Sequence, residues 1–134
     1  MSSENKVEDF RYELQRWKSY FQFIDDEVSF IEKLLNSYVF EPTTPNLFER
    51  LEQFKQEFAK SNQKKEQLQK KVLEQERHLG GISECTSKMD DTGYCKKHDR
   101  LRNEVGQYFG DYQKIKADVY GYAGLVLKRR KPVD

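Results

Sequence analysis

The feature that most constrains this chain is a run of ten apolar or aromatic residues in the first third of the sequence, each three or four positions after the one before. This spacing places every member on one side of a long α-helix, as the a and d positions of a heptad repeat that pack against neighbouring helices. The run therefore predicts a helix over residues 3–39. Its members are Val7, Phe10, Leu14, Trp17, Phe21, Ile24, Val28, Ile31, Leu35 and Tyr38.

A second run with the same spacing predicts a helix over residues 44–79. Thr44 suits the N-cap position, and Pro45 suits the first helical position, where its missing N–H costs nothing. The pair Gly80–Gly81 suits a helix C-cap, so we expect the helix to end there. Some members of this run are polar, which makes its buried face less apolar than that of the first helix. The members are Leu47, Leu51, Phe54, Phe58, Ser61, Lys65, Leu68, Val72, Gln75 and Leu79.

A third run predicts a helix over residues 92–128. Followed backwards, its apolar pattern ends at Tyr94, so we expect residues 80–92 to form a connection that is longer than most connections between helices. The basic segment 128–134 is expected to form a tail. The run contains Tyr94, His98, Leu101, Val105, Tyr108, Tyr112, Ile115, Val119, Tyr122 and Val126, and the candidate caps are Asp90, Asp91 and Thr92.

Three runs of nearly equal length predict an all-α fold, with three long antiparallel helices in an up-down-up, coiled-coil-like bundle. We expect residues 1–134 to form this single domain. When the three runs are aligned from end to end, every polar member of the second run acquires a suitable neighbour, which favours one bundle over separate helices. The expected neighbours are Tyr112 opposite Ser61 and His98 hydrogen-bonded to Gln75. The Lys65 ammonium is expected either to lie over the ring of Phe21 or Tyr108 or to reach Asp25.

Charge and hydropathy exclude several classes of protein. The 24 Lys and Arg residues nearly balance the 23 Asp and Glu residues, so no overall field attracts nucleic acid or an anionic membrane. No apolar stretch approaches the roughly 20 residues that cross a bilayer. The regularly spaced aromatic residues are untypical of a disordered chain. The first residues lack the pattern of a secretory signal, and we predict a cytoplasmic protein without a membrane span.

Motifs that carry enzyme chemistry do not occur in this sequence. It contains no nucleophile elbow, no P-loop and no glycine-rich dinucleotide fingerprint. A carboxylate-bridged di-iron site would require a glutamate three positions before each histidine. Gln75 and Cys95 occupy those positions before His78 and His98. We therefore predict that the protein is not an enzyme, and no small-molecule substrate is evident.

Every histidine and cysteine of the chain is expected at one end of the bundle. Two cysteines and two histidines are the ligand set of many structural zinc sites, although these cysteines lack the usual close pairing. Zinc binding is therefore one hypothesis. In the alternative, the histidines are structural and the cysteines are free thiols or form a bridge with each other. The four residues are His78, Cys85, Cys95 and His98.

A group of lysines in the second helix suggests a weaker alternative, the binding of nucleic acid or of an acidic surface. Phosphate binding favours a basic face that is free of acidic residues, but three glutamates lie among these lysines. The pattern therefore argues against nucleic acid as a partner. The lysines are Lys60, Lys64, Lys65, Lys70 and Lys71, and the glutamates are Glu66, Glu74 and Glu76.

Helix 3–39 carries more apolar surface than two neighbouring helices require. Tyr20 and Leu34 occupy g positions beside the first run, whereas Phe23 and Phe30 occupy c positions, which normally face water. In one interpretation, the 82–92 connection or the tail covers these rings. In the other, they form a strip that binds a second copy of the chain or another helical protein. We predict the second: a non-enzymatic interaction or scaffolding protein that self-associates through this strip.

Overall fold

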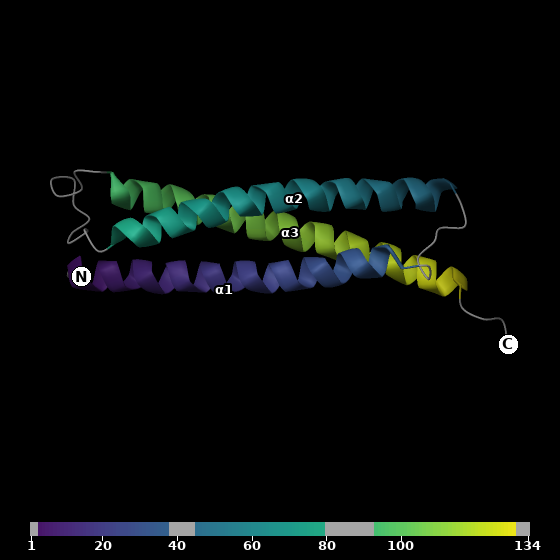
Figure 1. Ribbon diagram of the computed structural model, residues 1–134, viewed down its shortest axis with the longest axis horizontal. Coiled ribbons are helices and arrows are strands. Elements are labelled where there is room, and N and C mark those ends of the chain that lie inside the picture. Colours follow the sequence, from purple (N-terminus) through teal and green to yellow (C-terminus); the bar gives the residue numbers. More distant parts are fainter. Residues whose placement is uncertain (1–2, 38–44, 80–92, 131–134) are drawn as a thin grey trace.

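The computed structural model describes residues 3–37, 45–79 and 93–130, without the side chains of residues 3–6, 45 and 127–130. Three helices, α1 (Ser3–Leu35), α2 (Pro45–His78) and α3 (Tyr94–Arg130), lie side by side in an elongated bundle (Figure 1). The chain runs along α1, returns along α2 and runs forward again along α3. The predicted all-α, up-down-up bundle is confirmed.

Contacts between side chains fix the directions of α1 and α3. Three contacts join these helices, and successive contacts are seven residues apart on α1 and seven residues apart on α3. The two partners of each contact are therefore separated by 89 residues in the sequence. A constant separation requires that the two helices run parallel and in register. The contacts are Glu13 with Arg102, Tyr20 with Phe109, and Glu27 with Lys116.

Contacts between α2 and α3 show the opposite direction. As the residue number rises along α2, the number of its partner on α3 falls, which requires an antiparallel pair. Each of these contacts involves a tyrosine hydroxyl of α3, so the core of the α2–α3 pair contains satisfied polar groups. The Tyr122 hydroxyl donates to the carbonyl of Leu47, and the Tyr94 hydroxyl donates to the carbonyl of Gln75. Between them, the Tyr108 hydroxyl accepts a hydrogen bond from the hydroxyl of Ser61.

The three predicted runs form the core. Every described member is buried except Val7, Val28, Ser61 and Ile115, which are half-buried. Burial of a large apolar side chain contributes about 1.5–3 kcal/mol, so these positions supply most of the free energy that holds the helices together. The heptad spacing therefore predicts the buried face of each helix correctly.

Aromatic rings fill the space between α1 and α3, which make the fewest close backbone contacts of the three helix pairs. The ring of Phe10 stacks on His98 with centroids 3.8 Å apart, and Tyr20 lies 4.2 Å from Phe109. Phe21 also contacts Phe109, at 5.4 Å. Rings are large enough to span a wide gap between helices, so this side of the bundle depends on aromatic packing.

The polar pairs of the core test the predicted alignment of the helices. Lys65 forms an ion pair with Asp25, which was one of the two expected alternatives. Two other expected pairs are wrong, because α3 lies about one helical turn from its expected position along α2. The observed pairs are Ser61 with Tyr108 rather than Tyr112, at 3.5 Å, and Gln75 with Tyr94 rather than His98.

The end of α1 differs from the prediction. The helix ends at Leu35 rather than at residue 39. The Asn36 side chain donates to the carbonyl of Glu32 at 2.8 Å, and the Ser37 hydroxyl donates to the carbonyl of Leu34 at 2.8 Å. These bonds satisfy carbonyls of the last turn and so allow the helix to end. Tyr38 lies outside the described residues.

The start of α2 agrees with the prediction, but the start of α3 does not. Pro45 is the first residue of α2. Gly93 precedes α3 and accepts the first helical hydrogen bond, from the Lys97 amide at 2.9 Å, which makes it the N-cap residue. Its φ of +69° favours glycine. The candidate caps Asp90, Asp91 and Thr92 lie outside the described residues. The other predicted caps, Thr44 and Gly80–Gly81, lie outside the described residues.

Two glycine substitutions should change stability in opposite directions. Gly110 lies inside α3, and a Cβ built there meets no atom within 4 Å. Gly110→Ala should therefore raise the free energy of unfolding by about 0.5–1 kcal/mol, because alanine favours the helix. Gly93→Ala should lower it by about 1–2 kcal/mol, because alanine disfavours a positive φ. Urea unfolding followed by circular dichroism measures both changes, and a stabilised Gly93→Ala would contradict the described cap.

Candidate interaction surface

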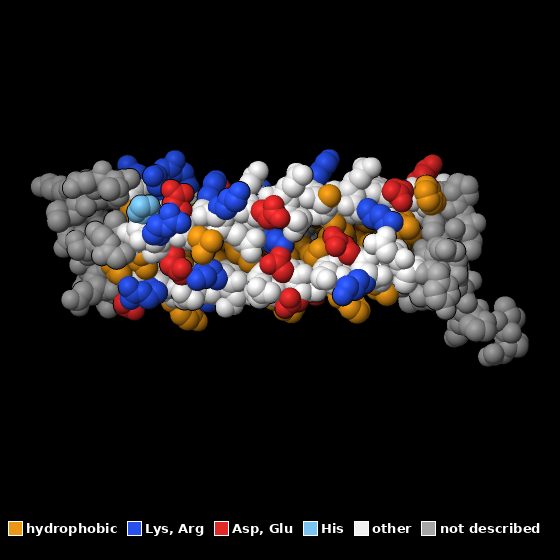
Figure 2. Space-filling model, viewed as in Figure 1, with side chains coloured by type: hydrophobic (Ala, Val, Ile, Leu, Met, Phe, Trp, Pro, Cys, Tyr) orange, Lys and Arg blue, Asp and Glu red, His pale blue; other side chains and the backbone are white. Residues whose placement is uncertain are grey.

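The side of α1 that faces away from the bundle carries three exposed aromatic side chains. Tyr12, Phe23 and Phe30 are 66%, 53% and 60% exposed. They occupy positions c and f of the heptad, which lie across the helix from the buried a and d positions. Figure 2 shows hydrophobic side chains that protrude along the lower edge of the bundle, where α1 lies in Figure 1. Among the described residues no helix covers these rings, although the Lys116 ammonium of α3 approaches the ring of Phe23.

These aromatic residues belong to a second repeat with steps of three and four residues, here named the outer stripe. All its members are exposed, and together they span most of the length of α1. The outer stripe therefore has the spacing of a helix-packing face, but it faces solvent. Its members are Asp9, Tyr12, Arg16, Ser19, Phe23, Asp26, Phe30 and Lys33.

The charged members of the outer stripe have no ion-pair partner among the described residues. Asp9, Arg16, Asp26 and Lys33 take part in none of the described salt bridges; Asp26 accepts only a 3.3 Å hydrogen bond from Gln22. Most other charged groups of α1 are paired within the chain. The paired residues are Glu8, Arg11, Glu13, Lys18, Asp25 and Glu27.

The structure separates the four residues of the predicted strip into two kinds. Phe23 and Phe30 face solvent, whereas Tyr20 and Leu34 are half-buried and pack against the core. The Tyr20 hydroxyl also accepts a 2.8 Å hydrogen bond from the Gln113 side chain. Tyr20 and Leu34 therefore lie toward the core beside the exposed rings. Their predicted role in partner binding remains a prediction.

Tyr12 is an exposed ring on this face of α1 that the sequence prediction missed. Only apolar residues beside the first run were considered as a strip, and Tyr12 lies eleven positions before Phe23. Steps of four, three and four residues nevertheless connect it to Phe23 through Arg16 and Ser19. The repeat was therefore present in the sequence, but finding it requires that the charged Arg16 and the polar Ser19 be counted as members of the same helix face.

A half-buried polar group lies beneath Phe23. The Lys116 ammonium lies 6.0 Å from the centre of the Phe23 ring and 3.1 Å from a carboxylate oxygen of Glu27. The Tyr112 hydroxyl donates to the other Glu27 oxygen at 2.5 Å. Burial raises the pKa of Tyr112, which keeps this donor protonated. Because each charge has a partner, this group holds α1 against α3 beneath the outer stripe.

Lys65 is the buried charge at the centre of the bundle. It is 4% exposed and pairs with Asp25, which lies closer to solvent. Burial lowers the pKa of Lys65, because the interior disfavours the charged form. A buried charge with one available partner restricts how two helices can align. We infer that this pair helps to set the alignment of α1 with α2.

His98 lies at the aromatic end of the α1–α3 contact. It is fully buried between Phe10 and Trp17, and its Nε2 lies 3.1 Å from Glu13. Arg102 donates two hydrogen bonds to Glu13, at 2.7 and 2.6 Å. This hydrogen bonding is the main reason that the pKa of Glu13 is lowered. Burial lowers the pKa of His98, whose Nδ1 has no partner in the described part of the chain.

The residues of the predicted zinc set lie in different environments. His78 is exposed at the end of α2, and His98 is bonded to Glu13. Cys95 is buried and disulfide-bonded, and a disulfide sulfur provides no thiolate for a metal. Cys85 lies outside the described residues, which contain no group of three potential metal ligands. Zinc binding by the four residues remains a prediction.

The lysines of α2 do not form one basic surface. Lys65 is buried, whereas Lys60, Lys64 and Lys70 are exposed. Lys71 pairs with Glu104 of α3 at 2.9 Å. The charges available on this side are therefore fewer than the sequence suggests.

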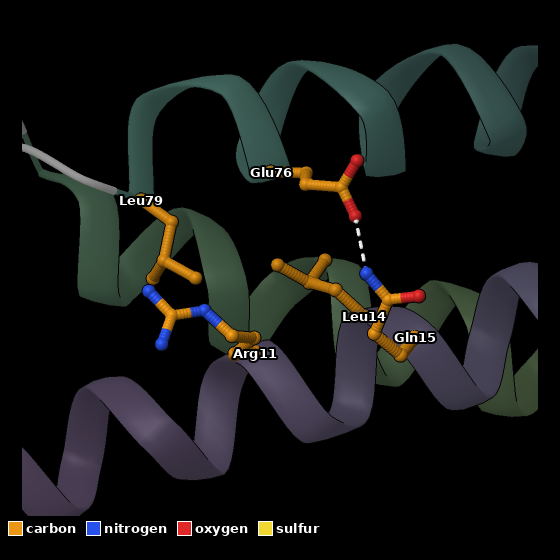
Figure 3. Close-up of a pocket in the computed structure, with 5 residues that line it drawn as sticks. All are labelled: Arg11, Leu14, Gln15, Glu76 and Leu79. Atoms are coloured by element: carbon orange, nitrogen blue, oxygen red, sulfur yellow. Dashed lines mark hydrogen bonds between the residues drawn. The ribbon is translucent and has the colours of Figure 1, made fainter.

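A shallow pocket lies between α1 and α2 near the end of the bundle (Figure 3). Its volume is about 130 Å³, below the roughly 300–1,000 Å³ of typical ligand sites. Its polar side chains already have partners: Gln15 donates to Glu76 at 2.9 Å, and Arg11 pairs with Glu8. Leu14 and Leu79 complete the lining. This pocket is therefore too small and too well paired to indicate a substrate site.

Comparison with protein-family models, with curated proteins and with solved structures found no match to this chain. Among the described helices, none has an apolar stretch long enough to cross a membrane.

The Lys65–Asp25 pair predicts a difference between two substitutions. Asp25→Ala should lower the free energy of unfolding by about 1–3 kcal/mol, because it leaves a buried ammonium unpaired. Lys65→Met should change it by less than about 1 kcal/mol or raise it, since methionine fills similar space without a charge. Urea unfolding at neutral pH measures both. Equal destabilisation by the two substitutions would contradict this account.

Burial of neutral His98 predicts a loss of stability in mild acid. Its pKa is lower in the folded chain than the ordinary 6.5, so its contribution is present above pH 6.5 and is lost as the pH falls below that value. The slope from this one group is at most about 1.4 kcal/mol per pH unit. Urea unfolding between about pH 7.5 and about pH 5, above the range where Glu13 titrates, should show this slope. His98→Asn should reduce it, and an unchanged slope would contradict neutral burial.

Proposed function

We propose that this protein is a non-enzymatic interaction protein that associates with another helix through the outer face of α1, and that a second copy of the chain is its partner. The observation that carries the proposal is the line of exposed rings at Tyr12, Phe23 and Phe30. Exposed large apolar groups that share one helix face are typical of protein–protein contacts.

Energetic considerations support this proposal. Complete burial of a phenylalanine side chain contributes about 1.5–3 kcal/mol, and each of these rings is more than half exposed. Contact with a second helix would therefore bury a large additional apolar area. Tyr20 and Leu34 lie beside the rings and are already held against the core, which provides a firm base for such a contact.

The state of the ionisable groups supports the absence of catalysis. Those with shifted pKa values in the α1–α3 contact, such as Glu13, His98 and Arg102, are bonded to one another. Catalytic groups with shifted pKa values usually face a cleft that admits a substrate. In the described part of the chain, these groups serve the contacts between helices.

We also keep the cytoplasm as the proposed location. The disulfide of Cys95 weighs against this location, because cytosolic thiol systems keep most cysteines reduced. The proposed contact does not depend on the redox state of Cys95, since this residue is buried on α3 and the outer stripe lies on α1.

The test is the mass of the protein in solution, measured by light scattering over a series of concentrations. The wild type should exceed the 16.1 kDa of one chain, and a Phe23→Asp/Phe30→Asp double variant should remain at that mass. Both substituted residues are exposed in the single chain, so the bundle should retain its helical content by circular dichroism. The melting temperature of the wild type should rise with concentration, because association stabilises the folded state.

Leu73→Asp is the matched control. Leu73 is a half-exposed apolar residue of α2, outside the outer stripe, so this variant should keep the mass of the wild type. A wild type that stays at the mass of one chain at every concentration would reject self-association. A wild type that associates equally well with both phenylalanines replaced would reject the outer face of α1 as the contact.

A further inference from the structure

The inference here rests on the proposed function and concerns the arrangement of the partner. The outer stripe alternates between c and f positions, and each kind of position recurs every seven residues, so the stripe can act as a second packing seam of α1. When two such stripes run in opposite directions, each c residue faces an f residue of the other copy. The order of the side chains then decides which alignment is favourable.

We propose that two copies of this chain pair through their α1 helices, antiparallel, about a two-fold axis that passes between Ser19 and Phe23. In this alignment every charged member of the stripe meets a charge of opposite sign. A ring meets a ring, and the smallest residue meets a phenylalanine. The pairs, each formed twice, are Asp9 with Lys33, Tyr12 with Phe30, Arg16 with Asp26, and Ser19 with Phe23 of the second copy.

The neighbouring antiparallel alignments are unfavourable. A shift of one heptad in one direction places Asp9 opposite Asp26 of the second copy. A shift in the other direction places Arg16 opposite Lys33 and sets Phe23 against Asp26. Like charges in direct opposition cost binding energy, so the charged residues select one alignment.

A parallel arrangement is also unfavourable. In a parallel, in-register pair each residue of the stripe meets its own copy, so Asp26 would face Asp26 and Arg16 would face Arg16. All four charged members would then oppose a like charge. The antiparallel pair avoids this, and it satisfies the four charges that have no ion-pair partner in the described part of one chain.

The residues beside the stripe are compatible with this contact. On one side lie Gln15, Gln22 and Ser29, which are uncharged and exposed. On the other side lie Glu13 and Glu27, whose charges are already balanced by cations of α3. The stripe from Asp9 to Lys33 is about 36 Å long at 1.5 Å per residue, which gives a contact that extends along most of α1.

Charge reversal on the full chain tests the arrangement. Arg16→Asp creates two Asp–Asp oppositions in the antiparallel dimer, and Asp26→Arg creates two Arg–Arg oppositions. Each single variant should raise the dissociation constant of the dimer by about 10- to 100-fold, measured by sedimentation. The double variant Arg16→Asp/Asp26→Arg should recover the affinity of the wild type, since its pairs are again of opposite sign.

A mixture of the two single variants provides a second readout. Positions 16 and 26 are both acidic in the first variant and both basic in the second. In a mixed antiparallel dimer, each position 16 therefore faces a position 26 of opposite charge. An equimolar mixture should therefore dimerise at concentrations where neither variant does so alone. Lys64→Asp and Asp118→Arg are matched controls, because both residues are exposed outside the stripe and have no described ion pair. Both controls should dimerise as the wild type does.

The outcomes separate this inference from the proposed function. If the phenylalanine double variant is monomeric but the charge variants dimerise normally, the outer face binds a second copy and the antiparallel alignment is wrong. If the single variants lose no affinity, the antiparallel alignment is wrong: a gain by the mixture then indicates a parallel, in-register pair, in which positions 16 and 26 of the two variants also meet opposite charges, and no gain indicates a shifted alignment. If the wild type is monomeric throughout, both the alignment and self-association are rejected.

Discussion

The structure depends on the uninterrupted heptad spacing of α1. Because nearly all of its described a and d residues are buried between α2 and α3, the rotation of the helix about its axis is fixed. This fixed rotation determines which of the remaining positions of α1 contact α3 and which face away from the bundle. The g residues Glu13, Tyr20 and Glu27 contact α3, and the c and f residues face away from the bundle. One periodicity therefore accounts both for the core and for the position of the exposed rings.

The apolar spacing predicts which faces are buried, but it does not predict how far one helix is shifted along another. A shift of α3 by one turn exchanges one large apolar or aromatic residue for another, so burial changes little. Polar pairs have fewer acceptable partners and so discriminate between such alignments. For Lys65 the sequence left a choice between an aromatic ring and Asp25, and the structure shows the ion pair with Asp25. Gln75 was assigned to His98, although Tyr94 bonds it with both its hydroxyl and its carbonyl. The sequence contained both candidates and offered no way to rank them.

The candidate surface was also only partly predictable, because some of its positions depend on the spacing of α1 alone and others depend on the neighbouring helices. Phe23 and Phe30 were recognised as excess apolar residues because their c positions lie away from the core in any helical bundle. The surroundings of Tyr20 depend on α3, whose distance from α1 cannot be read from the spacing of α1. Local chemistry also decided the helix ends: Asn36 and Ser37 bond the last turn of α1, and Gly93 provides the cap of α3 through its positive φ. Sequence propensities favour such caps, but several residues competed for each position.

Inside the bundle and on the outer stripe, apolar and charged residues have different physical roles. Burial of a ring contributes about 1.5–3 kcal/mol, whereas an exposed ion pair contributes at most about 1 kcal/mol. In the proposed dimer, the free energy of association would therefore come mainly from Tyr12, Phe23 and Phe30. Arg16 and Asp26 would contribute little affinity, but they would make the incorrect alignments costly through like-charge opposition. Lys65 and Asp25 act in the same way within one chain, where the apolar runs stabilise the bundle and the ion pair restricts its alignment. The proposed contact thus applies to two chains the rules that already govern the packing of one.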